Sequence, residues 1–388
     1  MATITENIQT LRSIKSDIKN AIIQKGGSVT DAFGTYAQAI TDLPSGGGGG
    51  TENELALVAR TLTEYSNDMV SSVGDYAFYS YSGLTYISLV NCSYIGNYAF
   101  YSCKSLTSIN LQLCKSINTY AFAWCSSLAN IDLPNCSYIN EHTFVGCKLL
   151  SSISLPLCSY IGNSAFAYCG TIKNIDLQNC KSIGSYAFQN CSSLTFVNLS
   201  NCGNISANAF NNCITLTSIN SPKCIIIGPN AFKSCSKLIS VNMPLCTSIG
   251  NGGFLSCMAL QSIDLPNCTD LNAQSVFYNC TNLTVVKIPL CRVLGYETFA
   301  NCRNLTQVYL NSVTSVTIMQ WSNTFNNSPN LTSVYVPSSL VDAFKTAPNW
   351  SSISDKIVAY REIAGGDIDN PEIGGEVGGG GDTDVPID

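Results

Sequence analysis

The sequence predicts an α/β solenoid of about twelve turns, each of about 22 residues, preceded by a helical hairpin. Three observations lead to this prediction. A period of about 22 residues runs through residues 65–358. Each period contains the spacing Leu-x-x-Ile-x-Leu, which ends in the two-residue alternation of a half-buried strand. Residues 1–22 instead carry apolar side chains at helical spacing.

The turn Leu194–Thr215 shows the period clearly. Its apolar side chains occupy repeat positions 1, 4, 6, 9, 12, 16, 17 and 20, which are Leu194, Val197, Leu199, Cys202, Ile205, Ala209, Phe210 and Cys213. We expect the strand of each turn to lie beside the preceding strand, about 4.8 Å away, in a parallel ladder that forms one wall. The short segment around Ala-Phe-x-x-Cys should form one helical or 3₁₀ turn in a second wall, with Phe pointing inward.

A single turn cannot fold alone. Burying eight apolar side chains contributes about 1.5–3 kcal/mol each at most, whereas ordering twenty-two residues costs about 1.5 kcal/mol per residue. Stability must therefore come from stacking, and the two ends need caps.

The consensus LxxIxLPxCxxIGxxAFxxCxx resembles the BspA-like subclass of leucine-rich repeats, over about residues 74–357. The phenylalanine column runs without a gap through ten full turns: Phe100, Phe122, Phe144, Phe166, Phe188, Phe210, Phe232, Phe254, Phe277 and Phe299. The resemblance implies a curved leucine-rich-repeat solenoid that is used for adhesion or recognition and has no catalytic residues.

The flanks of the regular repeats differ from them. We predict an amino-terminal cap at 53–83, the solenoid at 84–336, a carboxyl-terminal cap at 337–362 and a disordered, acidic, glycine-rich tail at 363–388. The cap should contain a helix in SSLVDAFKTAP with Ser338 or Ser339 as N-cap. One extra residue in the turn 260–282 predicts a local bulge on the side away from the strand wall.

Residues 1–45 predict a helical hairpin that anchors or oligomerises the protein, with residues 46–52 as a glycine linker. Its seam is formed by Ile4, Ile8, Leu11, Ile18 and Ile22. The segment IKSDIKNAIIQKGGSVTDAFGTYAQAITDLPSGGGGG resembles amino-terminal segments of tail-associated or other virion-attached proteins of gut bacteriophages. This resemblance implies attachment to a virion structural protein. Packing of the hairpin on the first solenoid turn is the alternative.

The chain has 20 cysteines, and all of them occupy repeat position 9 or 20. In a parallel ladder, equivalent cysteines lie about 4.8 Å apart with parallel Cβ vectors, which does not suit a disulfide. We therefore expect buried free thiols. The sequence has no C-x-x-C motif, so it predicts no metal site and no cofactor.

Charge and chemistry narrow the possible functions. The formal net charge is −6, but residues 362–388 hold eight acidic residues, leaving seventeen acids against nineteen Lys and Arg elsewhere. This balance does not favour a nucleic acid or an anionic membrane as partner. The one histidine, His142, occupies a position that other turns fill with Tyr, Ser or Asn, and Asp132 and Asp176 are two ladder steps apart. We therefore predict that the protein is not an enzyme.

Aromatic residues concentrate in the turns before residue 187. The predicted ligand-binding set, called the Tyr-rich surface below, is Tyr94, Tyr98, Tyr101, Tyr120, Trp124, Tyr138, Tyr160, Tyr168 and Tyr186. Tyr combines apolar area with a polar group and suits protein or glycan ligands. A solvated, partly self-covering tyrosine ladder is the alternative. The outward strand positions are polar, as at Asp132, Asp176 and Asn198, and suit either a solvated face or a second candidate site.

The leading hypothesis is a recognition protein on a phage virion, made in the host cytoplasm without a signal peptide, whose solenoid binds a host surface protein or glycan. The alternatives are a bacterial cell-surface adhesin of the BspA-like type and a purely structural virion component. The absence of a signal-peptide pattern and the hairpin favour the first and third.

The anchoring hypothesis predicts the result of removing residues 1–45. We expect the truncated protein to remain a folded monomer, because the repeats carry their own core, and to lose incorporation into its particle. Size-exclusion chromatography with light scattering measures the first property and particle co-purification the second. Incorporation of the truncated protein would show that the anchor lies elsewhere.

Overall fold

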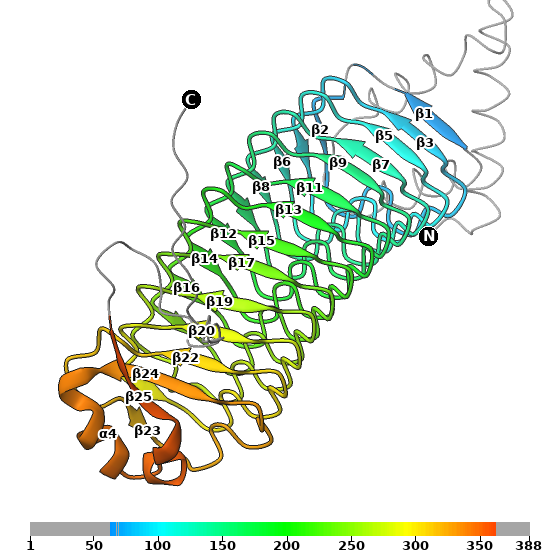
Figure 1. Cartoon of the computed structure of the whole chain (residues 1–388). Helices are drawn as coiled ribbons and strands as arrows, with labels where there is room; N and C mark the ends of the chain where they lie inside the picture. Colours follow the sequence, from blue (N-terminus) through cyan, green and yellow to red (C-terminus); the bar gives the residue numbers. More distant parts are fainter. Residues whose placement is uncertain (1–62, 67, 69, 362–388) are drawn as a thin grey trace, which may run out of the picture.

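The computed structural model describes residues 63–66, 68 and 70–361. These residues form an elongated, gently curved stack of about thirteen turns, with a small helical cap at its carboxyl end (Figure 1). The predicted parallel-strand solenoid is confirmed, with about one turn more than expected. The predicted hairpin at 1–45, the linker at 46–52 and the tail at 363–388 lie outside the described residues.

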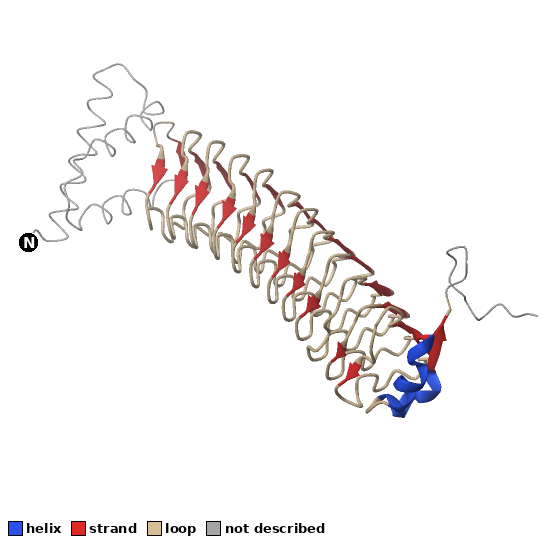
Figure 2. Ribbon diagram, turned by 90° about the vertical axis from the view of Figure 1, so that its left-hand side faces the viewer, coloured by secondary structure: helices blue, strands red, loops and turns tan. Residues whose placement is uncertain are grey.

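The first row of strands forms the predicted ladder. All its pairs are parallel, and equivalent residues pair 22 positions apart in the regular turns, as in Glu64 with Tyr86. Hydrogen bonding divides the row into three sheets, but the strands continue along one side of the stack (Figure 2). The strands are β1 (Glu64–Ser66), β3 (Tyr86–Ser88), β5 (Ser108–Asn110), β7 (Asn130–Asp132), β9 (Ser152–Ser154), β11 (Asn174–Asp176), β13 (Phe196–Asn198), β15 (Ser218–Asn220), β17 (Ser240–Asn242), β19 (Ser262–Asp264), β20 (Val285–Lys287), β22 (Gln307–Tyr309), β24 (Ser333–Pro337) and β25 (Ile357–Tyr360).

A second parallel ladder, which the sequence analysis did not predict, runs through repeat positions 11 and 12. Its two-residue strands place position 12 inside and position 11 outside. Two residues are too few to show the alternation from which a strand is predicted. The strands are β2 (Ser72–Val73), β4 (Tyr94–Ile95), β6 (Ser116–Ile117), β8 (Tyr138–Ile139), β10 (Tyr160–Ile161), β12 (Ser182–Ile183), β14 (Asn204–Ile205), β16 (Ile226–Ile227), β18 (Ser248–Ile249), β21 (Val293–Leu294) and β23 (Ile318–Met319).

The turn with the extra residue interrupts this second ladder. Between β18 and β21 the ladder narrows to two single bridges, Ser248 with Asp270 and Leu271 with Leu294. The first ladder continues through the same turn, because β19 pairs with β20 in register. The predicted irregularity on the side away from the first ladder is therefore present.

The segment around Ala-Phe-x-x-Cys is not a helical turn, which corrects the prediction. Within one turn, the N–H groups of Ala121, Ala123 and Cys125 donate to carbonyls three residues earlier. These are overlapping β-turns, and positions 15 and 19 adopt positive φ, as in Tyr120 (58°) and Trp124 (62°). Positive φ at the third residue is the requirement of a type II turn. The sequence suggested a helix because β-turns and helices both bring positions 17 and 20 to the same side.

This segment also bonds to the next turn. The N–H groups of Tyr98, Phe100 and Ser102 donate to the carbonyls of Thr119, Ala121 and Ala123, at 2.7–3.0 Å. The same three bonds recur from turn to turn, so three columns of peptide groups run along the solenoid axis. The third side of each turn is thus also joined to the neighbouring turns by backbone hydrogen bonds, as the strands are.

Aromatic rings and thiols fill the core. The phenylalanine column extends from Phe78 to Phe325, with centroids of neighbouring rings 4.9–5.5 Å apart. All twenty cysteines lie in the described part of the chain, and all are buried and free. Each thiol is placed to donate to a carbonyl: Cys125 Sγ lies 3.0 Å from Phe100 O in the preceding turn, and Cys136 Sγ lies 3.1 Å from Tyr138 O. Burial raises the pKa of Cys136 to about 11 and that of Cys114 to about 12.

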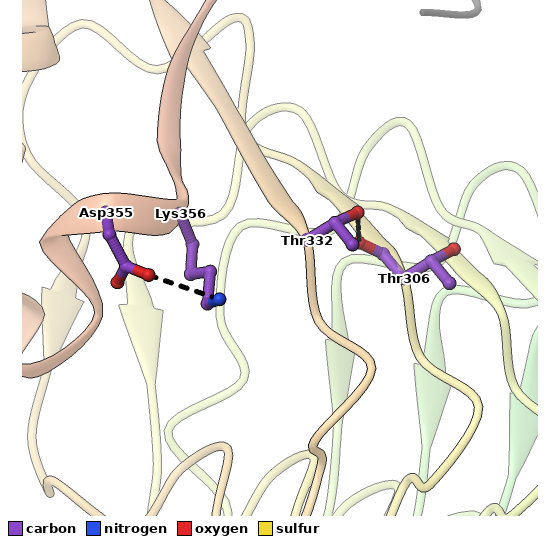
Figure 3. Close-up of polar contacts among 4 residues, drawn as sticks. All are labelled: Thr306, Thr332, Asp355 and Lys356. Atoms are coloured by element: carbon purple, nitrogen blue, oxygen red, sulfur yellow. Dashed lines mark hydrogen bonds and ion pairs between the residues drawn. The ribbon is translucent and has the colours of Figure 1, made fainter. Parts of the chain in front are cut away.

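Uncharged polar ladders replace ion pairs between the turns. At repeat position 2, Thr332 Oγ1 donates to Thr306 O at 3.0 Å, and Thr306 repeats this contact one turn earlier (Figure 3). The single ion pair among the described residues joins the sequence neighbours Asp355 and Lys356 at 3.1 Å (Figure 3). An exposed pair of this kind contributes little to stability. Contacts between turns are therefore made mainly by backbone, hydroxyl and apolar groups.

The carboxyl-terminal end contains η1 (Ser338–Leu340), α4 (Val341–Thr346) and η2 (Trp350–Lys356). The predicted N-cap is wrong: Leu340 is the N-cap of α4, and Ser338 and Ser339 lie in η1 without making a side-chain cap bond. Trp350 is buried, and its Nε1–H donates to Thr317 O at 2.7 Å. The chain then returns as β25, which pairs with β24.

The buried thiols predict loss of stability in alkali. A thiol in the unfolded chain titrates near pH 8.5, whereas burial holds the folded pKa of Cys158 and Cys202 at about 11. The thiol contribution to stability is therefore complete below about pH 8.5 and falls as the pH rises toward 11, by about 1.4 kcal/mol per pH unit for each such thiol. We expect the melting temperature to fall steeply between pH 8.5 and 9.5, before tyrosine and lysine titrate. Scanning calorimetry from pH 7 to 11 measures this, and a constant melting temperature would contradict it.

Candidate functional site

The structure divides the Tyr-rich surface into two groups. Tyr94, Tyr138 and Tyr160 begin β4, β8 and β10, and each precedes a buried isoleucine. Tyr94 and Tyr138 are well exposed, whereas Tyr160 is partly buried. Although Tyr138 and Tyr160 pair in the ladder, none of the ring contacts in the described part of the chain includes these three tyrosines. They point outward as separate rings.

The other six predicted residues lie on the turn segment that follows the second ladder. Two of them belong to a stacked column of four rings, Tyr76, Tyr98, Tyr120 and His142. Successive centroids are 5.0, 4.8 and 4.4 Å apart, and the planes are within 9° of parallel. The alternative reading, a self-covering tyrosine ladder, therefore describes this column.

A second stacked pair lies beside the column. Tyr79 and Tyr101 are 5.0 Å apart, and Tyr101 also contacts Tyr98 at 5.7 Å. Tyr101 and Tyr120 pack on a small cluster formed by Ala123, Val145 and Ala167, outside the main core. These alanines and valine occupy the same repeat position as Tyr79 and Tyr101.

Sequence reasoning missed Tyr76, Tyr79 and the role of His142. Tyr76 lies in the irregular first turn, but its repeat position is that of Tyr98 and Tyr120, and this register could have identified it. His142 occupies the same position one turn later and continues the column. Desolvation lowers the pKa of His142 from its usual value, although nearby Glu141 acts in the opposite direction. The imidazole is therefore mainly neutral near pH 7.

Three predicted residues of this segment have no ring partner in the part of the chain that the structure describes, and we call them the unstacked aromatics: Trp124, Tyr168 and Tyr186. Their side chains are 39%, 47% and 42% exposed. A Cβ at Gly146, which has φ +73°, would lie 2.3 Å from Trp124 Cε3. The Trp124 indole thus uses the space that a side chain at position 146 would fill.

The backbone beneath these aromatic residues is left-handed. Tyr98, Tyr120, Trp124, Tyr168 and Tyr186 all have φ between 54° and 64°. This conformation costs an ordinary residue about 1–2 kcal/mol, and Asn tolerates it better. Later turns place Asn at the same repeat positions: Asn208, Asn212, Asn230, Asn279 and Asn301. The early turns therefore carry large aromatic residues where folding favours a small polar one.

Part of the strand face, the second candidate site, is occupied with its own side-chain hydrogen bonds. Asn198 Nδ2 donates to Asp176 Oδ1 at 2.9 Å, and Asn242 Nδ2 donates to Asn220 Oδ1 at 2.7 Å. The backbone of Asp132 pairs with that of Ser154 on the neighbouring strand, whereas no hydrogen bond among the described residues occupies the Asp132 carboxylate. Side chains that bond along the ladder, as that of Asn198 does, have less capacity left for a ligand.

Neither a metal centre nor a membrane span is found in the part of the chain that the structure describes. No group of three or more potential metal ligands comes together there. None of the helices in residues 63–66, 68 and 70–361 has the length and apolar character needed to cross a bilayer.

Comparisons with known proteins agree with this geometry. The profile of the BspA type leucine rich repeat region matches residues 63–170, 115–239 and 225–347. No curated protein matches the chain.

Three solved structures are similar to this chain. A leucine-rich repeat protein from Bacteroides ovatus is 20% identical over 75% of this chain and 88% of that chain, with a TM-score of 0.43. A leucine rich cell surface protein from Faecalibacterium prausnitzii is 21% identical over 76% and 91%, with a TM-score of 0.37. The pneumococcal vaccine antigen PcpA is 16% identical over 77% and 89%, with a TM-score of 0.44.

Two tyrosines at the same repeat position should respond differently to the same substitution. Tyr98→Asn removes two stacking contacts, which should cost about 1–3 kcal/mol of unfolding free energy beyond the changes in burial and backbone strain that both tyrosines share. In Tyr186→Asn, the lost apolar burial and the relieved backbone strain, each about 1 kcal/mol, should nearly cancel. Chemical denaturation measures both changes. Phe188→Ala is the control for a core residue, with an expected loss of about 3–5 kcal/mol. A loss for Tyr186→Asn as large as that for Tyr98→Asn would assign Tyr186 a structural role.

Proposed function

Because the chain belongs to the BspA-type leucine-rich repeat family, we propose that it is a non-enzymatic recognition protein that binds a cell-surface protein or glycan through its Tyr-rich surface. Solenoids of this type offer a long, rigid, repetitive face for binding. Within that face, recognition is assigned to the amino-terminal half, where the aromatic residues lie.

One observation carries the proposal: the early turns hold exposed aromatic residues at left-handed positions. Strain of this kind is a starting point for a functional hypothesis when the fold gives no reason for it. The stacked column has a structural compensation, because each ring contacts its neighbours. Trp124, Tyr168 and Tyr186 lack a ring partner, although Trp124 lies against Gly146. Exposed Tyr and Trp are the residues that most often dominate binding energy.

We also propose that residues 1–45 attach the protein to a bacteriophage virion, with the solenoid displayed outward. The support is the resemblance of this segment to virion-attached proteins of gut bacteriophages and the apolar seam of Ile4, Ile8, Leu11, Ile18 and Ile22. Self-association through the same seam would give a multivalent display. Particle attachment and binding of a host surface are compatible roles for one chain.

Display on a bacterial cell surface as an adhesin is the second candidate. The family match supports it, because the repeats would serve binding in the same way in either location. A purely structural virion component is the third, and the bonded strand face with its Asp176–Asn198 contact suits such a spacer. Binding of intact cells by the isolated protein separates the first two roles from the third.

Substitution on the two candidate faces tests the location of the binding site. The variant Tyr94→Ser, Tyr138→Ser and Tyr160→Ser removes one aromatic group, and Trp124→Ser with Tyr168→Asn and Tyr186→Asn removes the other. We expect each to weaken cell binding about thirtyfold or more, because an interface anchor typically contributes 2 kcal/mol or more. Flow cytometry with labelled protein gives the affinities, and circular dichroism checks the fold. The matched control changes Asp132, Asp176 and Asn198 to Ser. Loss of binding in the control alone would move the site to the strand face.

A further inference from the structure

We propose that the unstacked aromatics form a binding face for a neutral, linear carbohydrate that lies along the solenoid axis. This inference rests on the proposed recognition role and specifies its ligand class. It assigns stacking on sugar rings to Trp124, Tyr168 and Tyr186, and not to the stacked column.

The first step concerns which ring faces are free. Tyr98 and Tyr120 each have a ring on both sides, at 4.4–5.0 Å, so they present only their edges and hydroxyl groups. A sugar ring places its C–H groups, which are slightly positive, against the negative face of an aromatic ring. Only a ring with an uncovered face can bind in this way. The unstacked aromatics have no ring partner among the described residues and are about two-fifths to one-half exposed. One face of the Trp124 indole lies against Gly146, so only its other face is available to a sugar.

The second step concerns charge. We considered repeat positions 13–19 in the five turns that carry or flank these rings, which are residues 118–124, 140–146, 162–168, 184–190 and 206–212. They contain one charged side chain, Glu141, whose Oε1 accepts from Asn163 Nδ2 at 2.8 Å. His142 is kept mainly neutral by its lowered pKa. The nearest lysine in sequence, Lys148, is exposed just outside these segments. A face with so few cations does not suit a polyanion or a nucleic acid, which bind through phosphate neutralisation.

The third step concerns hydrogen bonding. The same segments contain neutral polar side chains close in sequence to the rings, including Ser164, Ser185 and Gln189. The neighbouring Asn190 already accepts a hydrogen bond from Asn212 Nδ2 at 2.6 Å. Hydroxyl and amide groups both donate and accept hydrogen bonds, as sugar hydroxyls do. Aromatic faces combined with neutral polar groups therefore match the two surfaces of a sugar, its C–H face and its hydroxyl rim.

The fourth step concerns spacing. Trp124 and Tyr168 occupy the same repeat position two turns apart, and Tyr186 lies in the next turn. With about 4.8 Å between neighbouring strands, the first two are separated by about 10 Å along the axis. A ligand that contacts all three must extend over four turns, which is three ladder steps or about 14 Å. An extended oligosaccharide of several units has this length, whereas a single sugar does not.

Binding of defined oligosaccharides tests the inference directly. The probes are the neutral hexasaccharides of cellulose, chitin, xylan and starch, and a heparin hexasaccharide serves as the charged control. Calorimetry with the full chain should detect at least one neutral hexasaccharide and not the heparin fragment. The tryptophan emission, to which Trp124 contributes together with Trp321 and Trp350, should shift on binding. Tyr168→Asn with Tyr186→Asn should weaken that binding about tenfold or more, whereas Ile318→Asn, at an exposed position 60% accessible in β23, should not. Binding that persists unchanged in the double variant would overturn the assignment of these rings.

A second arm separates this inference from the proposed function. Cell envelopes from a panel of intestinal bacteria are tested for binding untreated, after periodate oxidation of their glycans and after proteinase digestion. Loss with periodate alone supports the carbohydrate inference. Loss with proteinase alone, together with no binding of the four neutral hexasaccharides, overturns it and leaves the recognition role intact with a protein partner. Failure of untreated envelopes to bind, while a hexasaccharide binds, supports the inference and counts against the cell-recognition role.

Discussion

In-register stacking of 22-residue turns is the constraint on which the rest of the structure depends. Because equivalent residues pair, as Ile161 pairs with Ile183, each choice of side chain is repeated at every level of the stack. Phenylalanines lie on phenylalanines, thiols meet the same carbonyl in each turn, and hydroxyls at position 2 bond to the turn before. This arrangement allows a protein with few charges to bury a continuous core without disulfides or ion-pair networks.

The same register gives the turn segments a net electric dipole along the solenoid axis. The strands do not contribute to this dipole. In the turn segments, peptide groups in three columns all direct their N–H toward the carboxyl end, as Phe166 does toward Ala187 O. The intervening N–H groups bond within their own turn and do not oppose this direction. Aligned peptide dipoles add, as they do in a helix, so the carboxyl end of this wall is positive and the amino end negative. Two different ends of this kind cannot be closed by the same structure, and the carboxyl end is closed by α4, η2 and Trp350.

The sequence predicts the fold well wherever a pattern is long enough. The first ladder follows from a six-residue spacing repeated in each turn, and the extra residue after Leu271 was placed on the correct side. The second ladder was missed because only two residues per turn form it. The helical turn was wrong because the spacing of Phe122 and Cys125 suits a helix and overlapping β-turns equally. Only the positive φ of residues such as Tyr120 distinguishes them, and a tyrosine does not signal that conformation as glycine would.

The candidate site, like the fold, was predicted from the sequence only in part. Repeat register alone brought the aromatic residues to one half of the solenoid, but it could not separate rings that cover one another from rings that remain free. That distinction depends on neighbours: Tyr98 has aromatic residues one turn before and after, whereas Tyr186 lies between Ser164 and Asn208. Stacking adds to the apolar burial that offsets the cost of a left-handed tyrosine in the first case, whereas burial acts without stacking in the second. Residues at one repeat position therefore meet the same folding requirement but are present for different reasons. Where stacking does not offset the cost of the left-handed backbone, binding of a ligand best explains the aromatic side chain.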